Sequence, residues 1–592
     1  MENKIIKKVV EGLKHLYNAE IDEKQVQLQK TRKEFDGDLT VVVFPFLRAS
    51  KKGPEQTAED LGEFIQENIE EITGFNVVKG FLNFEISPTY WLSVFNKISK
   101  TEFFGFNTPN SKPTIMVEYS SPNTNKPLHL GHLRTNFLGF SVAEILKANG
   151  HKVVKTQIIN DRGIHICKSM LAWQKFSDGE TPQSSGMKGD HFVGKYYVAF
   201  DKAYKKEIEE LVAGGMEKAE AEKEALLMKE TQQMLLKWEE GDKDVRALWG
   251  KMNGWVFDGF ESTYKTMGVD FDELYYESDT YLLGKDIVEE GLEKNQFYKK
   301  EDGSVWCDLS DVKLDDKLVL RGDGTSVYMT QDVGTAIERY KKHPDLEGMI
   351  YTVGNEQDYH FKVLFTILKK LGYSWAEGCY HLSYGMIELP DGKMKSREGT
   401  VVDADDLMSM VVNDAKEMTQ ERGHIEGMSE EEKELLYSTI GMGGLKYFLL
   451  KIDPKKGMIF DPKESIDLNG NTGPFIQYAY ARIQSLLNKA KESNLLMSYD
   501  EVEINQKEQE LIKLINAYPT TIQEAAKNYS PALIANYTYE LVKEFNSFYQ
   551  AVPIFKEEDA NKIAFRLMLS ENIGKIIKSA MLLLGVNVPN KM

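Results

Sequence analysis

The chain lacks the features that mark membrane, secreted and metal-binding proteins. Its 592 residues contain no apolar run of about 18 residues, which excludes a conventional membrane-spanning helix. The segment MENKIIKKVVEGLKHLYNAE has the spacing of an amphipathic helix and not the pattern of a signal peptide. The three cysteines, Cys167, Cys307 and Cys379, lie too far apart for the paired spacing of zinc sites or disulfide frameworks. We therefore expect a cytoplasmic protein with reduced cysteines, no zinc or other resident metal, and no membrane partner.

Basic residues are also in deficit, with 73 Lys and Arg against 92 Asp and Glu and a net charge of −19. This balance argues against indiscriminate nucleic-acid binding, because contacts to phosphates dominate that affinity. It leaves room for a structured RNA that is held by local basic or shape-complementary patches. The sequence has no internal repeat or low-complexity linker, and its length and 42% hydrophobic content fit two to four globular domains.

Residues 1–108 have the pattern of a separate α+β module. Apolar periodicity predicts helices over 4–18 and 56–69, and extended segments over 39–46 and 75–86. The turn residues from Asn107 to Pro113 mark the passage into the next domain.

Residues 109–460 alternate strands with helices, which predicts an α/β domain with a mainly parallel sheet. The candidate strands are 114–119, 153–159, 348–353 and 381–388. The charged stretch at about 175–300 predicts a helical insertion. Its Lys202–Lys237 section predicts a solvated amphipathic helix. Residues 461–592 have helical patterns only, such as 531–549 and 562–584, and predict an all-α bundle.

The first candidate site is the stretch VEYSSPNTNKPLHLGHLR at residues 117–134. A buried strand ends in Ser, Pro and Asn, and an apolar period of about 3.6 begins at His132. His129, Gly131 and His132 thus lie beside a helix N-terminus, where imidazoles and backbone N–H groups suit a polyphosphate. The plainer alternative is a pair of histidines that cap or pack a helix end.

The second candidate site is the segment KMKSREGT, which begins at Lys393 and follows a Pro390-Asp-Gly turn. A cationic loop with Lys393, Met394, Lys395 and Ser396 opposite the first site could neutralise a departing pyrophosphate. Taken alone, an exposed basic hairpin tip explains it as well.

Together the two motifs resemble the HIGH and KMSKS signatures of class I aminoacyl-tRNA synthetases. The wider context resembles the arginyl-tRNA synthetase family, and the likeness extends over about residues 35–592. The stretches that carry it are GHKVVKTQIINDRG, DGTSVYMTQDVGTA, GNEQDYHFKVLF, NTGPFIQYAYARI and LLLGVNVPNKM. The resemblance implies a Rossmann-type catalytic domain at 109–460 that binds ATP at His129, Gly131, His132, Met394, Lys395 and Ser396.

The same resemblance implies an arginine site. Glu118 and Asn123 match residues that hold the α-amino group and the carbonyl side of the substrate. Tyr328 and Asp332 are spaced to share one helix face, so a carboxylate can pair with the guanidinium while a ring packs on its plane. Gln357 matches a further side-chain contact. Without the resemblance, Tyr328 and Asp332 would be an ordinary helix surface pair.

One departure from the family pattern concerns the loop. The family-wide motif has Lys at its fourth position, where this chain has Ser396. Many arginyl enzymes that differ there have a lysine just before the first motif, and Lys126 fits that description. We therefore assign phosphate neutralisation to Lys126 with help from Lys393 or Lys395, against the alternative of a solvated loop lysine.

The flanking domains resemble the parts of this family that bind tRNA. Residues 1–108 resemble the module that contacts the D-loop, and residues 461–592 resemble the helical anticodon-binding domain. Residues 471–592 contain 13 basic and 13 acidic side chains, a balance far less acidic than that of the whole chain.

The resemblance implies ATP-dependent activation of L-arginine and its transfer to the 2′-OH of the terminal adenosine of tRNA-Arg, with Mg²⁺ on the ATP and activation that needs bound tRNA. We expect a monomer without an editing domain. Two alternatives are a class I synthetase for glutamate, glutamine or cysteine, and a catalytically inactive tRNA-binding paralogue.

Overall fold

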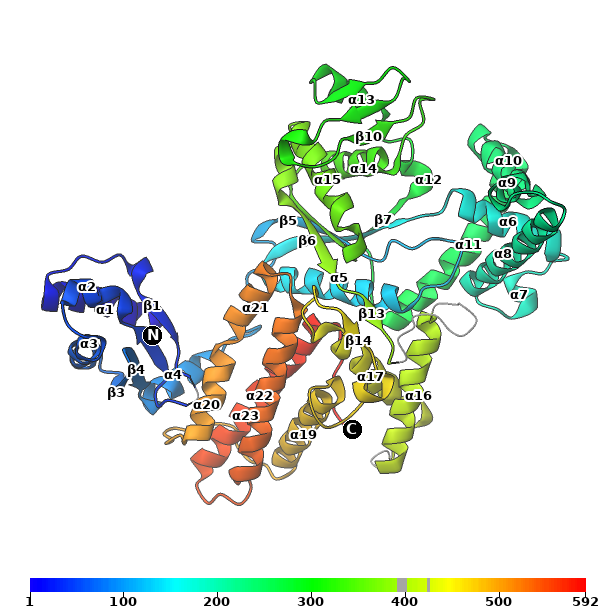
Figure 1. Ribbon diagram of the computed structural model, residues 1–592. Coiled ribbons are helices and arrows are strands. Elements are labelled where there is room, and N and C mark those ends of the chain that lie inside the picture. The colour runs from blue at the N-terminus through cyan, green and yellow to red at the C-terminus, as the bar shows by residue number, and fades with distance from the viewer. Residues whose placement is uncertain (33, 391–401, 423–425) are drawn as a thin grey trace. The chain divides into compact units, whose positions relative to one another are not determined.

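The computed structural model describes residues 1–32, 34–390, 402–422 and 426–592, and its main sheet is parallel (Figure 1). This sheet has the strand order β12-β11-β5-β6-β7. Its strands are β5 (Lys112–Glu118), β6 (His151–Ile159), β7 (Glu273–Tyr276), β11 (Leu346–Gly354) and β12 (Cys379–Tyr384). All four pairings are parallel, for example Met116 with Val154 and with Met349. The predicted α/β class is confirmed.

Helices cover both faces of this sheet. α14 (Tyr328–Lys342) and α15 (Asp358–Lys370) lie on one face, and α5 (Leu130–Ala148) lies on the other (Figure 1). Met116, Val154 and Met349 share a core with α14 and α15. α5 is apolar around most of its surface and largely buried, so it has no narrow amphipathic stripe. Its buried Arg134 donates to the carbonyl oxygens of Gly385, Pro454 and Lys456 at 2.8–3.1 Å.

The predicted strand 381–388 is two strands. β12 ends at Tyr384, and β13 (Ile387–Glu388) pairs instead with β14 (Met458–Ile459). Gly385 lies at the break, where an added Cβ would come within 2.4 Å of the backbone nitrogen of Gly457. The chain can therefore cross there only with a residue that has no side chain.

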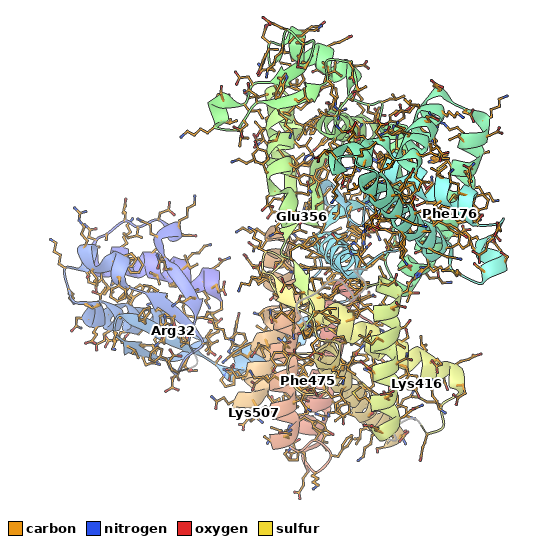
Figure 2. The ribbon with its side chains drawn as sticks, turned by 45° about the vertical axis from the view of Figure 1, so that its right-hand side comes forward. Arg32, Phe176, Glu356, Lys416, Phe475 and Lys507 are labelled. Carbon is orange, nitrogen blue, oxygen red and sulfur yellow. The ribbon has the colours of Figure 1, made fainter. Side chains whose placement is uncertain are left out.

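The stretch at about 175–300, predicted as a helical insertion, is mostly helical but not continuously so. It contains the edge strand β7 and the strand β8 (Phe297–Lys299), and the Lys202–Lys237 section is three helices rather than one. α6 (Ile164–Phe176) leads into the insertion, whose helices are α7 (Pro182–Ser185), α8 (Gly189–Ala213), α9 (Lys218–Glu224), α10 (Leu226–Glu240), α11 (Lys243–Met267), α12 (Glu277–Thr280) and α13 (Lys285–Glu293). Figure 2 labels Phe176, the exposed last residue of α6. A small antiparallel sheet, β10-β9-β8, follows, with β9 at Val305–Cys307 and β10 at Lys317–Leu320.

The N-terminal region is an α+β module, as predicted. Its antiparallel sheet has the order β1-β2-β4-β3, and the predicted extended segment 75–86 is a hairpin that turns at Lys79-Gly80. The elements are α1 (Glu2–Tyr17), β1 (Gln27–Lys30), β2 (Leu39–Val42), α2 (Leu47–Ser50), α3 (Pro54–Asn68), β3 (Ile72–Val78), β4 (Phe81–Ile86) and α4 (Pro88–Ile98).

From residue 462 onward the described chain is helical, which confirms the predicted all-α region. Its helices are α18 (Pro462–Ser465), α19 (Gly473–Glu492), α20 (Gln506–Asn516), α21 (Tyr518–Lys527), α22 (Pro531–Ala551) and α23 (Ala560–Leu583). They follow α16 (Ala404–Arg422) and α17 (Glu430–Leu450).

The chain divides into two compact units. One contains residues 1–104, 486–518 and 543–573, and the other contains the remainder, including the whole parallel sheet. The helices of the C-terminal region therefore contribute to both units. None of the helices in the described ranges is long and apolar enough to cross a membrane.

Candidate active site

The candidate site residues gather where the parallel strands end. β5 ends at Glu118, β6 leads to Asp161, β7 leads to Glu277, and β11 leads to Gln357. The connection from β5 runs to β6 on one side, whereas β11 flanks β5 on the other side. Such a change of direction at the carboxyl ends of parallel strands is the usual place for a ligand in an open α/β sheet.

His129 and His132 cap the N-terminus of α5 through one nitrogen each. Nδ1 of His129 accepts from the backbone N–H of Gly131, and Nδ1 of His132 accepts from the backbone N–H of His129, both at 3.1 Å. A ring whose Nδ1 accepts a hydrogen bond and that is neutral must have its proton on Nε2. The capping alternative and the ligand alternative are therefore compatible, since capping uses Nδ1 and leaves Nε2–H as a donor.

Both imidazoles are neutral near pH 7. Burial, followed by the charge of Lys126, lowers the pKa of His129 to about 4. Burial lowers the pKa of His132 well below its usual value, with smaller effects from His129 and Lys126. The two ring centroids lie 4.0 Å apart, so the pair presents neighbouring donors rather than two positive charges.

Lys126 supplies the positive charge of this turn. It depresses the pKa of both histidines and is itself half-buried, three residues before His129. A cation close to two N–H donors and a helix N-terminus is the arrangement that a triphosphate requires.

The backbone after residue 401 pairs with this turn. Leu130 N–H donates to Val402 O at 3.2 Å, and Ala404 N–H donates to Leu128 O at 3.0 Å. His129 and Asp403 form an antiparallel bridge between these two bonds. The chain that follows the KMKSREGT segment is thus held directly on the HLGH motif.

Glu118 lies at the end of β5 and forms an ion pair with Arg339 of α14 through Oε2. Arg339 also lies over the rings of Tyr275 and Tyr351, at 4.7 and 5.9 Å from their centroids. Beyond Glu118 the chain turns through Ser120 and Ser121, whose φ values of 75° and 48° are uncommon for serine. Asn123 follows, exposed, and forms a parallel bridge with Asn160.

Asp332 and Tyr328 lie on α14, one turn apart, as predicted. Oδ2 of Asp332 is 2.7 Å from Nε2 of His360, and the ring of Tyr328 is 74% exposed. Gln357 is exposed at the start of α15, next to Glu356, which is labelled in Figure 2. None of these three side chains, Tyr328, Asp332 and Gln357, is buried, so they are not part of the hydrophobic core.

A cavity of about 590 Å³ adjoins Tyr328. The charged residues that line it are Arg162, Glu239, Glu277 and Arg321. Burial raises the pKa of Glu277 to about 7; Arg162 opposes this shift, and Asp161 and Asp332 add to it. Two arginines and two glutamates line the cavity, and Arg162 is paired with Glu239. Glu277, with Asp161 and Asp332 nearby, is therefore the acidic group at the cavity that suits a cationic ligand.

The comparisons with known proteins agree along the whole chain. The family model for tRNA synthetases class I (R), catalytic domain, matches residues 94–461. The chain belongs to the arginyl-tRNA synthetase family. The model of the Arginyl tRNA synthetase N terminal domain matches residues 3–86, and that of the DALR anticodon binding domain matches residues 476–592.

Two arginine–tRNA ligases illustrate the similarity. The chain is 56% identical to that of Bacteroides thetaiotaomicron over all of both chains, and 59% identical to that of Flavobacterium psychrophilum over 96% of each. In fold it resembles the solved arginyl-tRNA synthetase of Thermus thermophilus, with a TM-score of 0.79 and 21% identity over all of both chains. The Plasmodium falciparum arginyl-tRNA synthetase gives a TM-score of 0.76 at 18% identity, covering 100% of this chain and 99% of that chain.

In this synthetase fold, the predicted site residues form two groups. Lys126 and His129 lie just before α5, and Gly131 and His132 lie in its first turn. Tyr328 and Asp332 lie on α14, and Gln357 lies just before α15. Glu118 lies between them in the sheet. Lys393, Met394, Lys395 and Ser396 lie outside the described residues, so their assigned roles stay predictions.

Three further residues of this site escaped the sequence reasoning. Arg339 is the counter-ion of Glu118, and His360 is the partner of Asp332. Glu277 directly follows β7, inside a stretch that was assigned to helix. The alternation in FDELYYES could have indicated an edge strand with a carboxylate at its end, but no local pattern marks Arg339 or His360.

Proposed function

We propose that this synthetase activates L-arginine with ATP and transfers the arginyl group to tRNA-Arg. The observation that carries the proposal is the separation of positive and negative groups at the carboxyl ends of the parallel strands. Lys126 and two neutral imidazoles lie at the start of α5, and the carboxylates Asp332 and Glu277 lie by α14 and after β7. The first group suits a triphosphate, and the second suits a guanidinium.

In the first step, a carboxylate oxygen of arginine attacks the α-phosphorus of ATP. A bond forms between this oxygen and phosphorus, the bond to the β-phosphate oxygen breaks, and pyrophosphate leaves. His129 and His132 donate from Nε2 to phosphate oxygens as charge builds there, and Lys126 neutralises the leaving pyrophosphate. ATP enters as its magnesium complex, with the ion on phosphate oxygens.

The arginine side chain is recognised by charge and by planarity. The carboxylates of Asp332 and Glu277 accept from the guanidinium N–H groups, and the ring of Tyr328 packs on the guanidinium plane. Gln357 adds a polar contact. Lysine has no planar fork, so it would leave part of these acceptors unpaired and is rejected.

Glu118 and Asn123 hold the α-amino group and the carbonyl side of arginine. The ion pair with Arg339 supports this role, because it fixes the carboxylate of Glu118 at the end of β5 through one oxygen. A fixed carboxylate positions the substrate for in-line attack.

In the second step, the 2′-OH of the terminal adenosine attacks the carbonyl carbon of arginyl-adenylate and AMP leaves. We infer that bound tRNA is required already for the first step. Residues 1–108 contact the D-loop, and residues 461–592 bind the anticodon, with residues 109–460 as the catalytic domain. The family models that match the two ends of the chain support this division.

The synthetase works in the cytoplasm as a monomer. None of the three cysteines forms a disulfide, which supports a reducing compartment. Burial raises the pKa of each thiol to about 12, so all three are poor nucleophiles.

Charging of a tRNA pool with each of arginine, lysine, glutamate and glutamine tests the proposal. We expect arginine alone to be esterified to tRNA, with AMP and pyrophosphate as products. Esterification of another amino acid, or of none, would refute it.

A further inference from the structure

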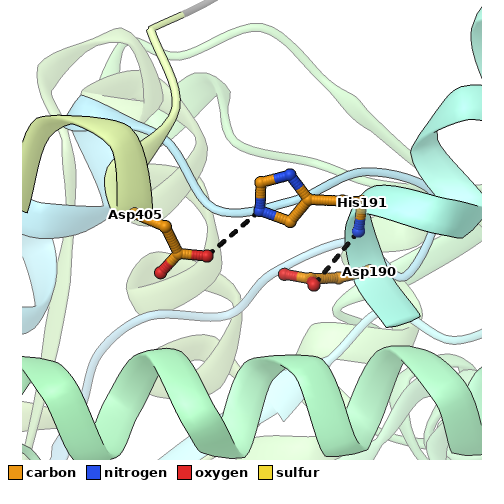
Figure 3. A group of neighbouring side chains, drawn as sticks. All are labelled: Asp190, His191 and Asp405. Atoms are coloured by element: carbon orange, nitrogen blue, oxygen red, sulfur yellow. Dashed lines mark hydrogen bonds and ion pairs between the residues drawn. The ribbon is translucent and has the colours of Figure 1, made fainter. Parts of the chain in front are cut away.

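A charged cluster outside the proposed substrate contacts joins the insertion to the chain after residue 401. Figure 3 shows its three neighbouring side chains, Asp190 and His191 at the start of α8 and Asp405 in α16. Nε2 of His191 is 3.1 Å from Oδ2 of Asp405, and the backbone N–H of His191 donates to Asp190 Oδ1 at 3.1 Å. Asp190 is fully buried, so this network is part of the packed structure.

The ligand atoms of Asp190, His191 and Asp405 lie within 4.8 Å of one another, which is a spacing that a metal ion could use. However, a cation is already present. The ammonium of Lys188 lies 2.5 Å from Oδ2 of Asp405 and 3.2 Å from Oδ2 of Asp190. The cluster is therefore an internal ion-pair network and not a metal site.

Asp403 connects this network to the HLGH motif. Its Oδ1 caps α16 by accepting from the backbone N–H groups of Asp405 and Asp406 at 2.8 and 3.3 Å, and its Oδ2 lies 3.5 Å from Nε2 of His191. The backbone of Asp403 forms the bridge to His129. Any contact that fixes Asp403 and Asp405 therefore also fixes one side of the turn at residues 126–132, which we call the phosphate turn.

The same helix supports the other side of that turn. A Cβ on Gly194 of α8 would lie 2.9 Å from Cδ of Pro127 and 3.6 Å from Cα of Lys126, so the helix backbone packs directly on the segment that presents Lys126. α8 is itself held closely on α11. A Cβ on Gly189 would collide with the carbonyl oxygen of Trp255, and one on Gly259 with Oδ1 of Asp190.

We propose that Lys188 and His191 are positioning residues for adenylate formation, which hold Asp403 and Asp405 so that residues 402–404 and Lys126–Leu130 keep one fixed geometry. The proposal rests on the proposed function for its kinetic consequence, but its structural part does not. A displacement of about 1 Å of a group that contacts the reacting atoms can cost about 100-fold in rate. A partly buried network of opposite charges, anchored on the fully buried Asp190, provides such rigidity because the loss of one member leaves its partners without a counter-charge.

The test compares Lys188→Met, Lys188→Arg and His191→Asn with Lys205→Met. Lys205 is on the same helix in an exposed pair with Asp201, where its loss removes a surface ion pair only. Hydrogen exchange by mass spectrometry reports the amides of Leu130 and Ala404, which bond to Val402 O and Leu128 O. We expect exchange about tenfold faster in these two segments for Lys188→Met and His191→Asn, protection restored by Lys188→Arg, and no change for Lys205→Met.

Pyrophosphate exchange kinetics complete the test, with tRNA present. We expect Lys188→Met to lower kcat by about tenfold or more and to raise the KM for ATP, while the KM for arginine stays within about twofold. A merely structural residue would lower Tm and the active fraction without changing either KM. Unchanged amide exchange, or faster exchange with unchanged kcat and KM for ATP, would overturn the proposal. If the unmodified protein does not activate arginine, the proposed function fails, while the exchange of the Leu130 and Ala404 amides still decides whether Lys188 holds the two segments together.

Discussion

Glu118 and Arg339 form an ion pair that is almost completely removed from solvent, with 9% and 2% of their side chains exposed. The pair joins the end of β5 to α14, so it links the strand that leads into the phosphate turn to the helix that presents Tyr328 and Asp332. We regard it as the structural link between the two halves of the proposed active site.

Replacing Arg339 with Met should therefore destabilise the protein strongly. The carboxylate of Glu118 would stay buried without its counter-ion, which costs about 3–5 kcal/mol. Thermal denaturation of the full chain measures the effect. Lys342→Met is the matched control on the same helix, because its partly exposed pair with Glu273 should contribute less than about 1 kcal/mol. Equal losses of Tm in the two variants would contradict this account of Arg339.

The low pKa of His129 predicts a loss of stability in weak acid. The folded protein holds this imidazole neutral down to about pH 4, whereas the unfolded chain protonates it near its ordinary pKa of 6.5. The unfolded state therefore binds more protons between these values, and stability should fall as the pH drops from 6.5 to 4. Tm measured at pH 7 and pH 5 should drop less in His129→Asn than in the unmodified protein, and an equal drop would refute the neutral assignment.

Asp332→Ala should damage arginine recognition selectively. The loss of a charged acceptor for the guanidinium is expected to raise the KM for arginine about 100-fold, while the KM for ATP stays within about twofold. Arginine and ATP titrations of pyrophosphate exchange give both values. Glu338→Ala, an exposed acid on the same helix, is the control and should change neither. An unchanged arginine dependence would remove Asp332 from the site.

Glu277 predicts a pH dependence of arginine use. Its carboxyl group has a pKa of about 7 in the protein without substrate, but only the ionised form can accept from a guanidinium. Below pH 7 a proton must leave before arginine binds, so kcat/KM for arginine should fall about tenfold per pH unit there. Glu277→Gln should have a lower kcat/KM and lack this acid limb. Persistence of the limb in the variant would assign it to another group.

Lys126→Ala should lower the rate of adenylate formation by about 100-fold or more, because it removes the described cation of the phosphate turn. Ser396→Lys in the same background should restore part of the rate, since the family motif has lysine at that position of the loop. Single-turnover formation of arginyl-adenylate measures both effects. A full rate in Lys126→Ala would show that this lysine is a solvated loop residue.

How much of this could be predicted from the sequence depends on the range of the interactions. The turn from Glu118 to His132 is encoded locally, as a strand, a breaker and a helix start, so its position was predictable. The partners Arg339 and His360 are brought to Glu118 and Asp332 only by the fold, and no local pattern specifies such pairs. Residues in α8 reach the phosphate turn for the same reason.

The short edge strand β7 shows a second limit. Four residues directly after a long charged helix are too few for a period-2 pattern to stand out, so the sequence does not reveal the strand that positions Glu277. In the N-terminal module, the two-residue turn at Lys79-Gly80 was hidden within a continuous extended pattern.

The central claim concerns the carboxyl ends of the parallel strands. ATP binds there at the HLGH turn, residues 129–132, and arginine binds at the carboxylates of Asp332 and Glu277. The ligase requires tRNA for this reaction. Arginine-dependent exchange of pyrophosphate into ATP, measured with and without tRNA-Arg, tests it most directly. We predict exchange with arginine when tRNA-Arg is present, and little or none with lysine, glutamate, glutamine or cysteine. Exchange that is driven by another amino acid, or no exchange even with the cognate tRNA, would contradict the account.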